Sequence, residues 1–122
     1  MRVTATFADH DGRRPPLGPV GPALGFVLEE GPTKVYFAGD TDVFPEMTDL
    51  APNLDVAMLP VWGWGPRLGH GHMNPRRAAE ALRLLVPRYA VPIHWGTLWP
   101  YGLGRVVPGR LTDPPREFAR FA

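Results

Sequence analysis

The sequence predicts an α/β layered domain, in which one mixed β-sheet carries helices on one of its faces. The first half contains short apolar, β-branched runs separated by Gly- and Pro-rich turns, which is typical of strands. The second half is predicted in the order strand, helix, strand, helix, which is typical of a sheet covered by helices. Such an arrangement leaves the opposite face of the sheet in need of a cover that this chain does not provide.

The predicted strands share a high content of Val, Phe, Leu and Ile, with turn residues at their ends. The run at residues 54–59 is continuously apolar and ends before Pro60, which indicates a buried strand. Residues 30–33 have the turn chemistry of a hairpin. The expected strands are residues 2–7, 24–29, 34–38, 54–59 and 89–93.

The helix signals are clearest near the middle of the chain. Asn74 is a good N-cap, Pro75 suits the first helical position, and Pro87 ends the helix. A short helix is expected at residues 44–50. A final helix is expected to begin near Thr112 or Asp113 and to run to the end of the chain.

The composition excludes several classes of protein. Thirteen basic and twelve acidic side chains leave a net charge of +1, which does not favour a nucleic-acid partner. The chain contains no apolar run near the roughly 18 residues that a membrane span needs, and it begins without an apolar leader, so we expect a cytoplasmic location. Because cysteine is absent, a metal site must use imidazoles and carboxylates.

Three polar residues follow the ends of predicted strands and are candidate metal ligands. They are His10, Asp40 and His94. The carboxyl ends of neighbouring strands open on one crevice, and two imidazoles with a carboxylate suit a divalent ion. Each residue also has a plainer interpretation, because His can cap a strand end and Asp40 can stabilise a turn.

Two runs of sequence resemble motifs of the metallo-β-lactamase superfamily. Residues 36–41 are similar to the motif whose Asp bridges two metal ions, and residues 92–97 are similar to the closing motif whose His binds the second ion. Residues 54–60 and 72–75 resemble the branch that contains ascorbate-6-phosphate lactonases and the phospholipase D acting on N-acyl phosphatidylethanolamines. The resemblance extends over roughly residues 3 to 100.

The resemblance implies the C-terminal half of an αββα sandwich. Residues 1–122 would form a single partial domain, since the signature His-x-His-x-Asp-His is not in this sequence. In the complete fold His10 would belong to the first of two ions, Asp40 would bridge both, and His94 would bind the second. Zinc is the expected metal, with manganese and iron as alternatives.

The same resemblance implies catalytic and substrate-binding residues. Asp40 and His72 would be catalytic, and His72, Trp62 and Trp64 would contact the substrate. The plainer interpretation of His72 is a polar loop residue, and that of the two Trp residues is core packing.

Two functions are therefore carried forward. In the first, the chain is part of a hydrolase in which a metal-bound hydroxide attacks a phosphodiester, ester or lactone of a small-molecule or lipid-like substrate. This chain would supply part of the dinuclear site and would be inactive alone. In the second, it is a non-enzymatic half-domain that associates with itself or with a second chain carrying the missing half.

Overall fold

The computed structural model describes residues 1–12, 18–50, 52–62, 69–96 and 102–122. It contains one five-stranded sheet in the order β1-β2-β3-β4-β5. The two pairings that involve β2 are antiparallel, and the other two pairings are parallel. The strands are β1 (Arg2–Phe7), β2 (Leu24–Glu30), β3 (Thr33–Phe37), β4 (Val56–Pro60) and β5 (Tyr89–Ile93).

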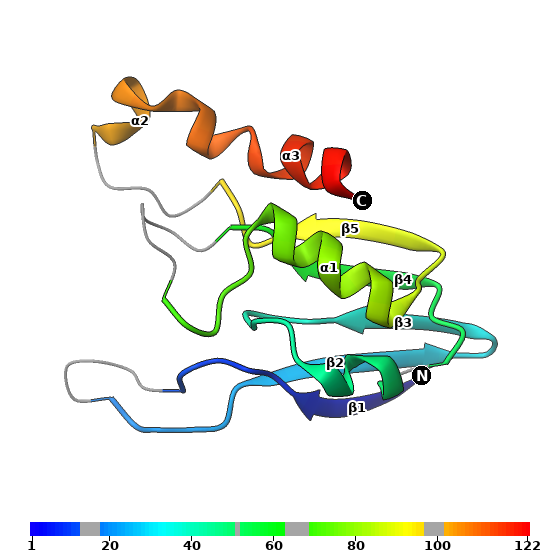
Figure 1. The fold of residues 1–122 in the computed structure, drawn as a ribbon. Helices are drawn as coiled ribbons and strands as arrows, with labels where there is room; N and C mark the ends of the chain where they lie inside the picture. The colour runs from blue at the N-terminus through cyan, green and yellow to red at the C-terminus, as the bar shows by residue number, and fades with distance from the viewer. Residues whose placement is uncertain (13–17, 51, 63–68, 97–101) are drawn as a thin grey trace.

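The direction of the strands decides where functional loops can meet. Strands β1 and β3 both run antiparallel to β2, so β1, β3, β4 and β5 all run the same way. Their carboxyl ends lie at one edge of the sheet, on the left in Figure 1. Side chains that follow these four strands are therefore brought together.

The helices gather on one side of the sheet. Helix α1 (Pro75–Leu85) connects β4 to β5 and crosses the sheet, as Figure 1 shows. The Asn74 side chain accepts a hydrogen bond from the Arg77 N–H at 2.9 Å, which caps the first turn. The remaining helical segments are η1 (Pro45–Asp49), α2 (Leu103–Val106), η2 (Pro108–Leu111) and α3 (Pro114–Phe121), of which η1 and α3 pack against α1.

The hydrophobic core lies between the sheet and α1. Val27, Tyr36 and Ala57 are paired across three neighbouring strands and form one row on this face, and all three are buried. They pack with side chains from α1, η1, α3 and neighbouring loops, among them Met47, Leu54, Leu59, Ala78, Ala81 and Phe118. This layer fixes the position of the strands whose ends carry the candidate site.

The opposite face of the sheet is apolar and largely open. Directly paired residues point to the same side of a sheet, and successive residues of a strand point to opposite sides. Two further cross-strand rows, which alternate with the buried row, therefore lie on this opposite face. They are Val3, Leu28, Val35, Val56 and Tyr89, and Ala5, Phe26, Phe37, Met58 and Val91. Several of these side chains are exposed, with Phe37 at 37% and Tyr89 at 64%. We call these ten residues the open face.

The predicted fold class, a single mixed sheet with helices on one face, is confirmed. Some local expectations were wrong. The strand expected at residues 54–59 is β4 at Val56–Pro60, where Pro60 occupies the final position and Val61 N–H donates to the Ile93 carbonyl at 3.1 Å. The short helix expected at residues 44–50 is present as the 3₁₀ helix η1, whereas the short segments α2 and η2 were not predicted. Among the described residues no helix is both long and apolar enough to cross a membrane, and the cytoplasmic location stays a prediction.

Candidate metal centre

The three predicted ligands lie at the common edge where the parallel strands end. His10 follows β1, Asp40 follows β3 and His94 directly follows β5. Gly39 has a φ of +68°, a conformation that favours glycine, and it turns the chain between β3 and Asp40. A Cβ at this position would lie 3.1 Å from the Leu24 carbonyl oxygen, so the close approach to β2 also requires glycine.

Three imidazoles surround a single carboxylate oxygen. The Oδ2 atom of Asp40 lies 3.4 Å from Nε2 of His10, 3.4 Å from Nε2 of His72 and 3.7 Å from Nε2 of His94. All four side chains are partly buried, between 25% and 39% exposed. Among the described residues, the group whose donor atoms lie close enough together to hold one ion is His10, Asp40 and His72.

Glycine at position 71 allows His72 to join this cluster. Gly71 has a φ of +89°, and a Cβ there would lie 2.8 Å from the Cα of His10. The loop before α1 therefore passes directly against the backbone of His10, and only glycine fits without displacing it. As a result the His10 and His72 rings meet edge to face, with centroids 4.8 Å apart.

Backbone carbonyls orient two of the three imidazoles. Nδ1 of His72 lies 3.3 Å from the His70 carbonyl oxygen, and Nδ1 of His94 lies 3.2 Å from that of Trp62. A carbonyl can only accept, so each of these Nδ1 atoms carries the hydrogen, and in the neutral ring the lone pair is left on Nε2. Metal-binding histidines are commonly held in this way, which fixes both tautomer and ring direction.

The other oxygen of Asp40 also fits a metal site. Oδ1 of Asp40 is buried, and it has no hydrogen-bond partner among the described residues. A buried acceptor without a partner is costly, and a cation satisfies it. With bonds of about 2.0 to 2.1 Å, the ligand atoms of a tetrahedral zinc site lie roughly 3.3 to 3.4 Å apart. The separations around Oδ2 are close to this value, so the donor set fits a divalent ion.

The backbone of His94 is held in an uncommon conformation. Its φ of 57° lies in the left-handed region, where residues other than glycine are disfavoured by on the order of 1 to 3 kcal/mol. Such strain persists where the surrounding structure fixes it, and it is frequent at functional sites. Here the strained turn directs the ring away from the course of β5 and towards Asp40.

A cleft opens beside these residues. It has a volume of about 530 Å³ and is lined by His10, Asp40 and His94. Its other wall comes from the loop before β2 and from the first residue of that strand, and it includes Val20, Pro22 and Leu24. A small molecule in this cleft could therefore contact the carboxylate and two of the imidazoles.

Of the two Trp residues predicted to contact substrate, Trp62 contacts His94 through its backbone carbonyl, but its side chain lines a different cavity. Trp62 is buried, and the Arg110 guanidinium lies over its ring at 4.8 Å. Trp62 lines a separate cavity of about 190 Å³ together with Arg110 and Asp113. Trp64 lies outside the described residues, and the substrate role of both residues stays a prediction.

Sequence reasoning did not identify His72 as a candidate ligand, nor the residues beside Asp40 that shape the site. His72 was expected to contact substrate, yet its Nε2 is as close to Asp40 as that of His10. The glycine between His70 and His72 was the available signal, because a tight approach of two backbones needs one. Thr41 and Asp42, which follow Asp40 directly, contact the loop that carries His10.

Comparison with known proteins identifies the family of this chain. A family model described as "Beta-lactamase superfamily domain" matches residues 1–95, so the chain belongs to the β-lactamase superfamily. Its fold is similar to that of the metallo-β-lactamase fold protein YhfI from Bacillus subtilis, with a TM-score of 0.57 at 16% identity, covering 92% of this chain and 43% of that one. The superfamily predicted from the sequence motifs is thus confirmed.

Curated relatives carry the printed name "UPF0173 metal-dependent hydrolase". The one from Thermococcus onnurineus is 39% identical over 103 residues, which is 82% of this chain and 41% of the relative. The one from Thermococcus kodakarensis is 36% identical over 123 residues, which is 98% of this chain and 46% of the relative. The chain therefore spans less than half the length of these relatives.

Two solved structures have a similar fold over most of this chain. Igni18, described as a novel metallo hydrolase from Ignicoccus hospitalis, superposes with a TM-score of 0.67 at 28% identity, covering 98% of this chain and 44% of that one. A protein from Parabacteroides distasonis described as a putative metal-dependent hydrolase gives a TM-score of 0.58 at 30% identity, covering 91% and 46%.

Proposed function

We propose that this chain contributes the metal-binding edge of a metal-dependent hydrolase that cleaves an ester, lactone or phosphodiester bond. The observation that carries the proposal is the approach of three imidazole Nε2 atoms to within 3.7 Å of one Asp40 oxygen. Family membership and the names of the relatives support it.

The roles of the residues follow from their placement. His10, Asp40 and His94 are the predicted ligands, with Asp40 shared between ions in a dinuclear site, and we add His72 as a fourth donor. A bound divalent ion, zinc by preference, would lower the pKa of water from about 15.7 towards 7. The apolar wall around Leu24 would hold the uncharged part of a small-molecule or lipid-like substrate beside the ligands.

Metal titration of the chain 1–122 tests the proposal. Zn²⁺ or Co²⁺ affinity is measured by titration against a chromophoric chelator, and Asp40→Ala is expected to abolish the binding seen in the wild type, because the three imidazoles converge on that carboxylate. Asp49→Ala, an exposed acid on η1, is the matched control and is expected to bind like the wild type. Unchanged metal affinity of Asp40→Ala would contradict the proposed metal site.

The role of His72 needs its own comparison. His72→Ala is expected to weaken metal binding as His10→Ala does, whereas His70→Ala changes a side chain that is 81% exposed and serves as the control. Unchanged metal affinity of His72→Ala would contradict its role as a ligand and would favour the substrate contact predicted from the sequence. Because these residues are only part of the superfamily's ligands, we expect weak binding and little turnover by the chain alone, measured on a chromogenic ester and a chromogenic phosphodiester.

The open face favours a second candidate function, association as a half-domain. Ten apolar residues of five strands form this face, and its exposed members include Phe37 and Val91. Contiguous apolar surface of this kind commonly marks an interface. The partner would be a second copy of the chain or a polypeptide carrying the rest of the fold, and this role is compatible with the hydrolase.

Light scattering after size exclusion tests the association. Phe37→Lys is expected to lower the associated fraction, because a charge is placed at the centre of the open face. Val106→Lys, at a residue 74% exposed on α2, is the matched control and is expected to change nothing. A wild-type chain that stays monomeric at high concentration would argue against self-association.

A further inference from the structure

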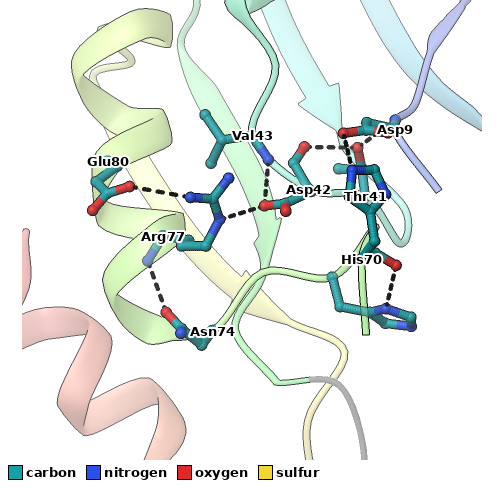
Figure 2. Close-up of polar contacts among 9 residues, drawn as sticks. Asp9, Thr41, Asp42, Val43, His70, Asn74, Arg77 and Glu80 are labelled. Atoms are coloured by element: carbon teal, nitrogen blue, oxygen red, sulfur yellow. Dashed lines mark hydrogen bonds and ion pairs between the residues drawn. The ribbon is translucent and has the colours of Figure 1, made fainter. Parts of the chain in front are cut away.

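A network of polar contacts joins the three loops that carry His10, Asp40 and His72. It consists of Asp9, Thr41, Asp42 and Arg77, which we call the polar brace (Figure 2). None of these residues is a candidate ligand. Each lies in a ligand-bearing loop or in the first turns of the helix that follows one.

Thr41 connects the first two loops through its hydroxyl. The side chain has no exposed surface, and its Oγ1 accepts a hydrogen bond from the Asp9 N–H at 2.8 Å. The same hydroxyl donates to the Asp42 carbonyl at 2.9 Å, and the Asp42 N–H donates to the Asp9 carbonyl at 2.9 Å. Thr41 adjoins Asp40, and Asp9 adjoins His10. A buried hydrogen-bonded link therefore joins the residues next to these two candidate ligands, whose side chains lie 3.4 Å apart.

Arg77 connects the third loop to the second. Its Nε donates to Oδ1 of Asp42, a side chain only 15% exposed, and that oxygen also accepts the Val43 N–H at 2.7 Å. The backbone N–H of Arg77 is held by the Asn74 side chain, as Figure 2 shows. Since His72 lies two residues before Asn74, the ion pair fixes the start of α1, and with it His72, against the Asp40 loop.

We propose that Thr41 and Arg77 are positioning residues of the metal site, which hold the His10, Asp40 and His72 loops in ligand geometry before an ion arrives. This inference rests on the proposed metal function. Ligands on unconnected loops would have to be ordered on binding, which weakens affinity, and loss of outer partners typically costs 10- to 100-fold in metal affinity.

Substitutions of Thr41 in the chain 1–122 provide the first test. Thr41→Val keeps the shape and removes the hydroxyl, and Zn²⁺ and Co²⁺ affinity is expected to fall by about 10- to 100-fold. Thr41→Ser restores the hydroxyl and is expected to recover most of the affinity. The visible absorption of bound Co²⁺ is recorded as well, because loosened ligands change its band shape, whereas lowered fold stability alone leaves the bound spectrum unchanged.

Substitution of Arg77 gives a second test, which does not require a change to a fully buried side chain such as Thr41. The side chain is 41% exposed, so Arg77→Met is expected to leave circular dichroism unchanged while weakening Co²⁺ binding by roughly 10-fold. Arg83→Met, at an exposed arginine of the same helix, is the matched control and is expected to bind like the wild type.

The outcomes separate the two proposals. A wild-type chain that binds no metal overturns the proposed function, and the positioning role with it. If the wild type binds metal and folded Thr41→Val has the same metal affinity and the same Co²⁺ spectrum, only the proposed role of Thr41 is overturned. The role of Thr41 is also overturned if Thr41→Ser does not recover the metal affinity. If Thr41→Val does not fold, the proposal is decided by comparing the Co²⁺ affinities of Arg77→Met and Arg83→Met. Equal affinities of these two variants would contradict the positioning role of the polar brace.

Discussion

The two faces of the sheet are built from the same five strands but are covered very differently. On the face beneath α1, Tyr36 and Ala57 have no exposed surface. On the open face, Phe37 follows Tyr36 directly in β3 and is 37% exposed, and Tyr89 of β5 is 64% exposed. Both faces are apolar, so hydrophobicity alone does not decide which one is buried. The β4-α1-β5 crossover decides it, because it carries the helix to one side.

The largest effect is expected for a core residue of the covered face. Leu59 has no exposed surface, and Leu59→Ala should lower the free energy of unfolding by about 2 to 5 kcal/mol, through lost burial and the cavity that remains. Urea denaturation followed by circular dichroism measures this change. A loss below about 1 kcal/mol would show that the covered face is not a packed core.

The covered face should also make stability depend on alkaline pH. Burial raises the pKa of Tyr36 from 10.0 to about 12, an effect that the nearby Thr6 hydroxyl partly offsets. Below pH 10 both states keep the phenol protonated, so stability from this group is fully present. Between pH 10 and 12 the unfolded chain loses the proton while the folded chain keeps it, so the free energy of unfolding should fall by about 2 to 3 kcal/mol.

Tyr36→Phe is the control for this pH dependence, because it removes the titrating group and keeps the ring. Its free energy of unfolding should fall less steeply over the same interval. Parallel pH profiles of the two proteins would contradict the assignment to Tyr36.

The helix that covers the face depends on its cap. Asn74→Ala removes the acceptor of the Arg77 N–H and should lower the free energy of unfolding by about 1 kcal/mol. Asn74→Asp keeps an acceptor and should be close to the wild type, and thermal denaturation compares the two. Equal losses of stability in the two variants would show that Asn74 does not stabilise the protein through its side-chain cap.

The smallest effect is expected on the open face. Val91 is 39% exposed, and Val91→Ala should change the free energy of unfolding by less than about 1 kcal/mol, because little burial is lost. The free energies of unfolding of Val91→Ala and of the wild type are compared at several protein concentrations, which tests whether the open face is buried by association. A loss as large as that of Leu59→Ala, growing with concentration, would show that an associated chain buries the open face.

Much of the local structure could be predicted because its causes are local. The expected strands at residues 2–7 and 89–93 have the same bounds as β1 and β5, since β-branched and apolar runs end at turn residues. The start of α1 was predicted from Asn74 and Pro75, which cap and open the first turn. The short segments α2 and η2 were missed because each is only four residues long and leaves little periodicity to detect.

The candidate site was predictable only in part. The placement of His10, Asp40 and His94 after strands indicated that they could converge, and the structure brings all three to one edge. The place of His72 as a neighbour of Asp40 was not predictable, because it depends on Gly71 passing against His10 across about 60 residues of chain. Likewise, the polar brace joins residues that adjoin the ligands but are far apart in sequence.

By itself, the sequence determined the strands, the capped helix, the superfamily and the types of donor available, since these follow from local patterns and from the absence of cysteine. Only the tertiary structure decided which sheet face is covered, how four donors meet at Asp40 and which residues hold their loops together. The physical reason is that such contacts depend on strand direction and on the side to which α1 crosses. Neither is encoded in any short stretch of residues.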